Sequence, residues 1–573
     1  MIPSSSPPDA GDKPEPAEPP GRQPGAARQA TAVAEAASTP GVASSTATAE
    51  PSPPSPPPPA DTSGPHTADD ATPWGPAADG GVRDGPPRRS DVAVAAGLGA
   101  VALALYASTL LPGVGYSGDT AKWQFLGRVG GTPHATGYPL YLALDKLWVN
   151  TFRVGELAWR VNLLSSIFGA ATVAVLFLLL RQLGTRRSIA AATVATFAVT
   201  YTFWSQAVVA EVYTLHLLLL STLTLCLARW RYGGSVWWLR AGLAVLALSF
   251  GNHLGTSLAV PGVLWVVLSD HRRSVTLRNA LWAAGCLAVA VGQYGYLLWM
   301  DDVGRYAEYR RLDSWGDIWD MVTGGPFRER MWAFGPGALA DARVPMLARL
   351  GWEEVSLLAV PALYGVWRAL RQVGPRRHVA IGLLLLAAAA TAYALEFDVP
   401  DVFVFFLPLW LVVAVFLGIG VEGVARAAAP RLHGRVRVAA AAVLVVVPVA
   451  MAAANYGRAD QSDDVTHARR FERLVDVAGH DALLVTDNYR DSEFVWYYLL
   501  GEGLGDERRL RLGNMVAPGR VRRYLDGSGL PGIAPAGLPV YTATPQQARD
   551  LRAEGLDVTE VAPGAWRVEL PPA

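Results

Sequence analysis

Charged residues are scarce in this sequence. Asp, Glu, Lys and Arg make up 17% of its 573 residues, and hydrophobic residues make up 51%. Charged residues reach about a quarter of an ordinary soluble chain, so this composition excludes that class and indicates a polytopic membrane protein. Neither sign of charge is in excess, because 49 basic residues match 49 acidic ones. The totals therefore suggest no nucleic acid partner.

Cysteine is nearly absent, with only Cys226 and Cys286 in the sequence. Both fall within long apolar runs, so we expect no disulfide framework outside the membrane. Neither has the spacing of a metal ligand, and no divalent metal is indicated. A cleavable secretory signal is not expected either, because the first apolar run begins near Asp91 and no short hydrophobic segment precedes it.

Residues 1–90 form a tract of Pro, Ala, Ser and Thr with almost no aliphatic clusters. Such a segment cannot bury enough apolar surface to offset the loss of chain entropy on folding. The sequence therefore predicts a disordered tail.

Apolar runs close to the roughly 20 residues that span a bilayer recur from Asp91 onward, and we count about eleven. The run over 240–269 is broken at Gly251, Asn252 and His253, so it could form two short helices or one kinked helix. The approximate extents of the runs are 92–112, 160–183, 188–204, 207–228, 240–252, 254–269, 280–300, 346–369, 379–395, 402–424 and 438–455.

Arginine placement favours two helices in that run, because short cytoplasmic connections concentrate Lys and Arg. Arg88 and Arg89 put the N-terminus inside, and the later arginine groups all fall inside only if 240–269 crosses twice. Eleven crossings then put residues 113–159, 301–345 and everything after 456 outside. The later groups are Arg186, Arg187, Arg229, Arg231, Arg240, Arg272, Arg273, Arg278, Arg371, Arg376, Arg377, Arg431, Arg435 and Arg437.

This topology gathers acids, histidines and an asparagine near the outer ends of the spans. Each ionisable group costs roughly 2–3 kcal/mol or more at a span centre, so a one-sided cluster indicates a functional cavity. Two members have plainer alternatives: Asp119 could cap a helix and Glu211 could hydrogen-bond at a helix end. The set is Asp119, His134, Glu211, Asn252, His253, Glu396, Asp398 and Asp401.

Several motifs follow one another over about residues 92–425. They read SGDTAKWQ, HATGYPLY, AWRVNLLSSIFGA, FWSQAVVAEVYTLHLLLL, GNHLGT and FDVPDVFVFFLPLWL. In order and spacing they resemble a family within the GT-C superfamily of membrane glycosyltransferases, the family that includes the transmembrane protein O-mannosyltransferase of immunoglobulin-like plexin domains and its bacterial relatives. We therefore expect a polytopic α-helical, GT-C-like fold.

The first loop departs from the family pattern. Members commonly read Asp-Ser-Gly-Glu, whereas here Tyr116 stands at the first acid and Asp119 at the second. The usual His-Pro-Pro-Gly is replaced by His134, Ala135, Thr136 and Gly137. One carboxylate of the catalytic type remains in that loop, which puts a two-acid mechanism there in doubt.

The resemblance implies an inverting glycosyltransferase that takes a sugar, mannose in the first instance, from a polyprenyl-phosphate lipid. The acceptor would be a protein or a cell-envelope glycan at the outer face, and no cofactor is implied. Displacing a phosphate from an anomeric carbon passes through an oxocarbenium-like state. The site therefore needs a base for the acceptor and a stabiliser for the phosphate. Asp119, just outside the first apolar run, is the expected base.

Arg160 is the expected phosphate ligand, because it lies at the outer start of the second apolar run and its planar fork suits a phosphate. It could instead anchor a helix end at the interface. Lys122, Arg128, His134 and Tyr138 are further candidates on the donor side. The acceptor side or cavity wall is expected to include Glu211, Tyr213, Asn252, His253, Asp398 and Asp401.

Two outer loops are expected to shape the cavity. Gly130, Gly131 and Gly137 would let the loop over 116–148 approach a ligand closely, and irregular backbone at that depth is tolerated where it lines a wet cavity. The tryptophan-rich segment 301–345 reads as an amphipathic loop lying on the bilayer.

The pattern after Tyr456 changes to that of a small α/β domain. DALLVTD, LPVYTA and WRVEL read as strands, and DSEFVWYYLLGEGL and TPQQARDLRAEGL as helices of a mostly parallel sheet. Residues 486–494 would lie at a strand's carboxyl end, where such sheets bind ligands. Acceptor recognition there competes with a plain helix cap by Asp491 or Ser492.

The predicted protein is therefore a multi-pass protein of the plasma membrane. It has a cytoplasmic tail over 1–90, a transmembrane domain over 91–455 and an extracytoplasmic α/β domain over 456–573. The alternative is a transporter or lipid flippase, but such proteins show paired halves and acids toward both faces, which we do not find.

Overall fold

The computed structural model describes residues 88–308, 311–514 and 519–572. The predicted disordered tail lies outside the described residues up to position 87.

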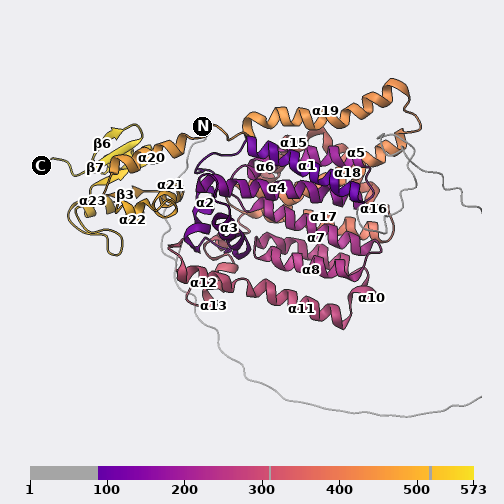
Figure 1. The fold of residues 1–573 in the computed structure, drawn as a ribbon, viewed down its shortest axis with the longest axis horizontal. Coiled ribbons are helices and arrows are strands. Elements are labelled where there is room, and N and C mark those ends of the chain that lie inside the picture. Colours follow the sequence, from indigo (N-terminus) through magenta and orange to yellow (C-terminus); the bar gives the residue numbers. More distant parts are fainter. Residues whose placement is uncertain (1–87, 309–310, 515–518, 573) are drawn as a thin grey trace, which may run out of the picture. The chain divides into compact units, whose positions relative to one another are not determined.

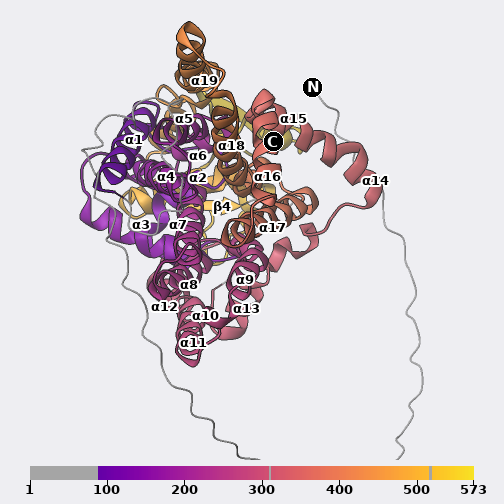
Figure 2. The same ribbon diagram turned by 90° about the vertical axis from the view of Figure 1, so that its right-hand side faces the viewer.

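Long apolar helices form the bundle of the described chain. In this part of the chain, seven helical segments are long and apolar enough to cross a membrane. They lie roughly parallel to one another (Figure 1) and are seen end-on in Figure 2. The protein is therefore a multi-pass membrane protein. The segments are α1 (Arg89–Ser108), α4 (Leu157–Gln182), α7 (Tyr213–Arg231), α11 (Leu277–Gly292) with α12 (Gly295–Val303), α17 (Pro375–Glu396), η6 (Val402–Phe406) with α18 (Leu407–Ala428), and α19 (Gly434–Ala459).

Shorter helices account for the remaining predicted spans, so the count of eleven crossings stays a prediction. The run over 188–204 is divided between two helices rather than forming one. The shorter segments are α5 (Arg187–Ala198), α6 (Tyr201–Ala207), α8 (Val236–Phe250), η2 (Leu254–Ala259) with α9 (Val260–Leu268), and η5 (Ser356–Leu358) with α16 (Ala359–Leu370).

The broken run over 240–269 forms two helices that make a hairpin. After α9, the short helix α10 (His271–Ser274) returns to the start of α8. There the Arg273 guanidinium donates to the Gly234 carbonyl at 2.7 Å, and Arg231 pairs with Asp270 at 2.9 Å. The kinked single-helix alternative is therefore wrong.

A buried acid pairs with arginines from neighbouring helix ends. Asp91, at the start of α1, pairs with Arg181 at 3.0 Å and with Arg187 at 2.7 Å. Asp91 is 1% exposed, so both guanidinium groups compensate a desolvated charge. These contacts place the start of α1, the end of α4 and the start of α5 at one end of the bundle.

The margins of the bundle expose apolar side chains. α19 and α11 lie at opposite margins (Figures 1 and 2). Val438 on α19 is 70% exposed and Leu287 on α11 is 65% exposed. Exposing such apolar surfaces to water is unfavourable, whereas the hydrocarbon core of a bilayer solvates them.

Irregular segments between α1 and α4 sit at the other end of the bundle. They include α2 (Thr120–Val129), β1 (Gly131–Thr132) and α3 (Pro139–Thr151). β1 pairs in parallel with β2 (Tyr306–Ala307). Gly131 has a φ of 124°, and a Cβ there would overlap the Tyr306 carbonyl. Its glycine requirement therefore comes from packing against the protein's own chain and not, as predicted, from approach to a ligand.

The loop over 301–345, which is predicted to lie outside, contains short helices and exposed tryptophans. Trp315, Trp319 and Trp332 are 54%, 71% and 68% exposed. Such side chains suit the predicted position at a bilayer surface, which stays a prediction. The helices are α13 (Trp315–Val322), η3 (Gly325–Arg330), α14 (Pro336–Ala338), η4 (Leu339–Arg343) and α15 (Val344–Glu354).

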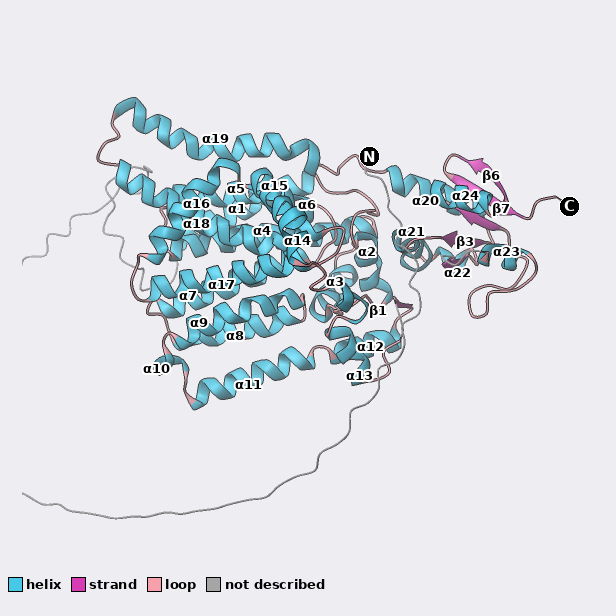
Figure 3. Ribbon diagram, turned by 180° about the vertical axis from the view of Figure 1, so that it is seen from behind, coloured by secondary structure: helices cyan, strands magenta, loops and turns pink. Residues whose placement is uncertain are grey.

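The C-terminal residues form a five-stranded sheet in the order β4-β3-β5-β7-β6 (Figure 3, strands in magenta). The first three strands are parallel, but β5, β7 and β6 are antiparallel. The mostly parallel prediction is therefore only half correct, because the tight turn between β6 and β7 is too short for a crossover. The strands are β3 (Leu483–Thr486), β4 (Arg511–Asn514), β5 (Val540–Thr542), β6 (Asp557–Ala562) and β7 (Ala565–Glu569).

Helices surround this sheet, and α21 contacts α2 of the preceding segment. The helices are α20 (Thr466–Ala478), α21 (Tyr489–Trp496), η7 (Tyr497–Gly501), α22 (Leu504–Glu507), α23 (Arg520–Leu525) and α24 (Pro545–Ala553).

Candidate active site

A buried lysine lies at the centre of the polar residues on this side of the bundle. The Lys122 side chain is 0% exposed. Its Nζ lies 3.2 Å from Asp119 Oδ1, 2.8 Å from His134 Nδ1, 2.7 Å from Glu308 Oε2 and 3.0 Å from Glu493 Oε1. These five residues are called the Lys122 cluster below.

The cluster is assembled from segments far apart in the sequence. Asp119 and Lys122 lie one turn apart at the start of α2. The ladder between β1 and β2 continues in a hydrogen bond from the Glu308 N–H to the Thr132 carbonyl, which brings Glu308 beside His134. Glu493 comes from α21 of the C-terminal domain. The site is therefore complete only when that domain is in place.

Hydrogen bonding selects one tautomer of the neutral His134 ring. Lys122 has only donors, so His134 Nδ1 must accept from it. The proton of the neutral ring is then on Nε2, which lies 3.1 Å from the Tyr138 hydroxyl and 3.5 Å from Asp119 Oδ2. This arrangement holds the imidazole beside the carboxylate of Asp119.

The charges of the cluster divide its acids into two kinds. Burial opposes ionisation of Asp119 and Glu308, but the Lys122 ammonium outweighs it, and the pKa of each carboxyl lies below its usual range. Burial raises the pKa of Glu493 well above its usual range, with further contributions from Glu308 and Asp119 that Lys122 only partly offsets. Burial lowers the pKa of Lys122, but the three carboxylates reverse this and hold it well above the usual value. Asp119 is thus ionised at neutral pH.

The backbone of Asp119 is held by Glu211. The Asp119 N–H donates to Glu211 Oε1 at 3.1 Å. Gly118 precedes it with a φ of 56°, and a Cβ there would lie 2.7 Å from the same oxygen, so only glycine leaves room for the contact. Asp119 precedes α2, but within the described chain its side chain makes no capping hydrogen bond. The cap alternative is therefore wrong, and the carboxylate faces the cluster.

A second contact to Asp119 comes from the C-terminal domain. The Tyr489 hydroxyl hydrogen-bonds to Asp119 Oδ1 and lies 3.3 Å from the Gly118 carbonyl. The Lys122 ammonium lies 5.1 Å from the centre of the Tyr489 ring. The Asp119 side chain is still 24% exposed, so a ligand can reach this carboxylate.

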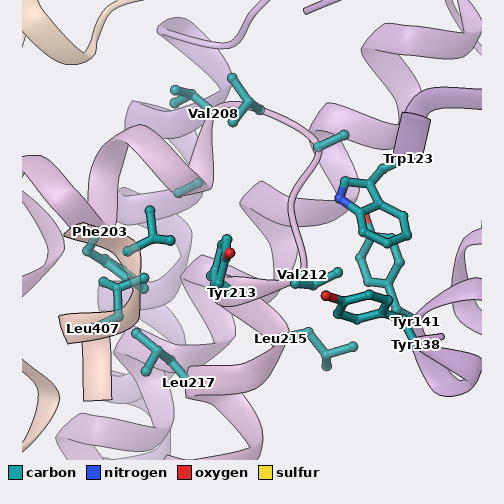
Figure 4. Close-up of a cluster of buried hydrophobic side chains, with 14 of the residues drawn as sticks. Trp123, Tyr138, Tyr141, Phe203, Val208, Val212, Tyr213, Leu215, Leu217 and Leu407 are labelled. Carbon is teal, nitrogen blue, oxygen red and sulfur yellow. The ribbon is translucent and has the colours of Figure 1, made fainter. Parts of the chain in front are cut away.

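Aromatic rings continue from the cluster into the bundle. Tyr138 lies 5.0 Å from Trp123 and 5.9 Å from His253 between ring centroids, and His253 lies 5.7 Å from Tyr213. Figure 4 shows Trp123, Tyr138 and Tyr141 side by side, with Tyr213 on the neighbouring helix. The structure therefore brings together Tyr138, Tyr213 and His253, which were predicted on separate motifs.

Of the other predicted cavity residues, one lies near the aromatic rings, one makes a structural contact and one is exposed. Asp401 precedes η6, whose Phe405 ring lies 5.9 Å from the His253 ring between centroids. Asp401 therefore lies near the aromatic rings described above. Asn252 is buried and donates to the Val212 carbonyl at 3.2 Å, which is a structural contact. Asp398 is exposed, its N–H donates to the Arg330 carbonyl, and within the described chain no side-chain contact joins it to the cluster.

Arg160 lies in a different setting from the predicted one. Its Nη1 donates to the Val149 and Phe152 carbonyls at 3.1 and 3.0 Å, at the C-terminal end of α3. No hydrogen bond or ion pair among the described residues joins it to the Lys122 cluster. The guanidinium satisfies carbonyls that a helix end leaves open, so the geometry does not support the predicted phosphate contact. Lys122 likewise faces carboxylates and not a free site.

Three residues of the site were not named individually by the sequence analysis: Glu308, Tyr489 and Glu493. Glu308 falls in the loop read as a bilayer-surface segment. Tyr489 and Glu493 lie within 486–494, the segment predicted at a ligand-binding strand end, and this prediction was the available signal. The predicted cap by Asp491 or Ser492 is wrong, because Asn488 caps α21 by accepting the Asp491 N–H at 3.0 Å.

Comparison with known proteins identifies the fold. ArnT from Cupriavidus metallidurans bound to undecaprenyl phosphate superposes with a TM-score of 0.56 at 14% identity, over 84% of this chain and 97% of that chain. The apo form of ArnT gives 0.54 at 13% identity, over 82% and 96%. This is a GT-C fold. The predicted GT-C-like, polytopic helical fold is thereby confirmed, whereas the eleven helices and the extracytoplasmic position of the C-terminal domain stay predictions.

Sequence comparison supports the predicted resemblance within this GT-C fold. The family model for the protein O-mannosyl-transferase TMEM260 N-terminal domain matches residues 129–276. The protein O-mannosyl-transferase TMEM260 of Mus musculus is 32% identical over 128 residues, which are 22% of this chain and 18% of that protein. The matched segment carries His134, Tyr138 and Glu211, whereas Asp119 and the C-terminal domain lie outside it.

Proposed function

We propose that this protein is a membrane glycosyltransferase that transfers a sugar from a polyprenyl-phosphate donor to an acceptor hydroxyl. The observation that carries the proposal is Asp119, an ionised and partly exposed carboxylate held by Lys122 at the polar end of a GT-C fold. The match to an O-mannosyl-transferase family supports mannose as the sugar and a protein as an acceptor. The undecaprenyl phosphate bound to ArnT supports a polyprenyl carrier. A cell-envelope glycan is the other acceptor class.

The chemistry is a single displacement with inversion. The acceptor hydroxyl gives its proton to Asp119 as its oxygen attacks the anomeric carbon. The bond from that carbon to the phosphate oxygen breaks, and polyprenyl phosphate leaves with the bonding electron pair. Lys122 and His134 hold the carboxylate in position, so no reorganisation is needed as charge develops.

The leaving phosphate requires a cation that the protein does not already use. Arg490 is exposed, follows Tyr489 in the chain, and lies close enough to Asp401 for an electrostatic interaction. Its guanidinium can form two parallel hydrogen bonds to a phosphate. We assign Arg490 to the donor side in place of Arg160.

No divalent metal is part of this proposal. The Lys122 ammonium occupies the position between Asp119, Glu308 and Glu493 that a cation would take. A metal there would have to displace a buried lysine whose pKa the three carboxylates raise.

The proposed topology has eleven crossings, a cytoplasmic N-terminus and an extracytoplasmic C-terminal domain in the plasma membrane. It is supported by the arginine pairs at one end of the bundle and by the hairpin of α8 and α9. The Lys122 cluster and α21 then share the outer side.

The test is donor cleavage by the purified full chain in lipid nanodiscs. With radiolabelled polyprenyl-phosphate mannose, the protein should release polyprenyl phosphate and pass the mannose to an acceptor or to water. Intact donor after prolonged incubation, in the presence of both peptide and glycan acceptors, would reject the proposed function.

A further inference from the structure

A cavity of about 670 Å³ lies beside the Lys122 cluster. Its lining comes from β2, α21, η7, β4 and the segment around Ile533. Glu308, Tyr489 and Glu493 belong to both the cavity and the surroundings of Lys122. The cavity therefore adjoins the cluster that holds the proposed catalytic carboxylate of Asp119.

Tyr489 stands between the cavity and Asp119. Its hydroxyl hydrogen-bonds to Asp119 Oδ1, the type of contact that an acceptor hydroxyl must make before it gives up its proton. Tyr489 itself is 43% exposed, so the ring can move aside without opening a packed core. The Tyr489 hydroxyl therefore occupies the Asp119 oxygen that an acceptor hydroxyl would need.

The walls of the cavity suit apolar side chains. The aromatic groups Tyr306 and Trp496 are joined there by a set of aliphatic residues. Charged groups, among them Arg305, Asp506 and Arg511, also line the cavity, so its surface matches a peptide that presents both apolar and polar side chains. The aliphatic residues are Leu499, Leu500, Leu510, Leu512 and Ile533.

The cavity also reaches the edge of the sheet. Arg511 and Leu512 of β4 line it, and β4 is an edge strand whose one neighbour among the described strands is β3. An edge strand offers N–H and C=O groups that an extended peptide can pair with, while alternate side chains enter adjoining pockets.

We propose that this cavity binds the acceptor as an extended polypeptide segment beside β4, whose serine or threonine hydroxyl displaces the Tyr489 hydroxyl from Asp119. The inference rests on the proposed function and assigns its acceptor site to the C-terminal domain.

The test compares two tryptophan substitutions, one in the lining of the cavity and one outside it. Ile533→Trp fills the cavity, and Val561→Trp is the matched control on β6, the other edge strand, where Val561 is 44% exposed. The probe is a capped synthetic peptide of alternating valine and threonine, with polyprenyl-phosphate mannose as the donor. Mannose transferred to the peptide and mannose released to water are measured in the same reaction.

Ile533→Trp should raise the KM for the peptide about tenfold and lower the ratio of peptide transfer to donor hydrolysis, whereas Val561→Trp should match the wild type. Tyr489→Phe keeps the ring but removes the competing hydroxyl, so it should lower the peptide KM about two- to tenfold, as expected for one hydrogen bond.

Two results would overturn the acceptor site while leaving the proposed function intact. One is an equal peptide KM in the wild type and Ile533→Trp. The other is transfer to a mannan oligosaccharide, sensitive to Ile533→Trp, with none to the peptide, because it would assign the cavity to a glycan. Failure of the wild type to cleave the donor at all would instead reject the proposed function.

Discussion

The carboxylate of Glu493 lies 3.0 Å from the buried ammonium of Lys122, which joins α21 of the C-terminal domain to α2 of the membrane domain. Glu493 is 3% exposed, and Glu308 already lies 2.7 Å from the same ammonium. One positive charge is thus shared among several acids. Glu493 is the acid of this group whose pKa rises, because burial favours its neutral form.

The raised pKa of Glu493 predicts that folding stability falls as pH increases. The folded state binds this proton more tightly than the unfolded chain does, so the contribution is complete below the ordinary glutamate pKa of about 4.3. It is lost as pH rises through the folded value. The thermal midpoint of the purified chain should therefore fall between pH 5 and pH 8, and less so in Glu493→Gln, which cannot ionise.

Glu507→Gln, at an exposed position on α22, is the control and should follow the wild-type curve. If the thermal midpoints of the wild type and Glu493→Gln changed equally with pH, the raised pKa of Glu493 would be contradicted.

Arg160→Ala should destabilise the fold without weakening donor use by the folded protein. The substitution leaves the Val149 and Phe152 carbonyls without their partner, at a cost of about 1–3 kcal/mol for a buried group. Arg160→Lys should recover only part of this, because an ammonium lacks the fixed fork of a guanidinium. The measurements are the thermal midpoint and the donor KM. A normal midpoint with a raised donor KM would return Arg160 to the phosphate site.

Arg490→Ala should raise the KM for the polyprenyl-phosphate donor by about tenfold or more, since a hydrogen bond to a charged group contributes about 1.5–3 kcal/mol. The peptide KM should change little. Arg549→Ala on α24 removes an exposed arginine from the same domain and serves as the control. Identical donor KM values in the two variants would exclude Arg490 as a phosphate ligand.

The sequence predicts well what depends on local pattern. Apolar length and arginine placement predicted the helices and the hairpin over 240–269, because spanning a bilayer constrains each run independently. The motifs predicted Asp119, Tyr138 and His253 at one site. What failed depends on distant packing. From the sequence, Lys122 is a cation available to a ligand, but in the folded protein Glu308 and Glu493 pair with it. Arg160 is likewise a candidate phosphate ligand in the sequence, but in the folded protein it donates to carbonyls at the end of α3.

The sequence analysis missed two of the five strands, β4 and β6, for a related reason. β4 and β6 are edge strands, which carry a weaker hydrophobic pattern than central strands because one side is not covered by the sheet. In β6, Val558 is buried and its neighbours Asp557, Thr559 and Glu560 are exposed, and the position of the strand beside β7 is set by the turn and not by the pattern of its own residues.

Membrane topology can be measured with reporters. A reporter fused after Asp460 should report an outside location, and one fused after Arg273 an inside location, because the inner ends of the helices carry the arginines. An inside location after Asp460 would contradict the eleven crossings. It would also leave α21 on the wrong side of the membrane to contact α2, so the Lys122 cluster could not form.

Asp119→Asn is the substitution that most directly tests the proposed chemistry. An acceptor hydroxyl is a weak nucleophile until a carboxylate takes its proton as the new bond forms, and asparagine keeps the size of the side chain but cannot take the proton. Transfer should fall by about a hundredfold or more, while donor binding persists because the phosphate contacts lie elsewhere. The loss should be the same with peptide and with water as acceptor, which separates a missing base from a damaged acceptor cavity. A purified Asp119→Asn protein that cleaves polyprenyl-phosphate mannose at the wild-type rate would remove Asp119 as the base, and Glu211, whose carboxylate lies 3.1 Å from the Asp119 amide nitrogen, would be the next acid to test.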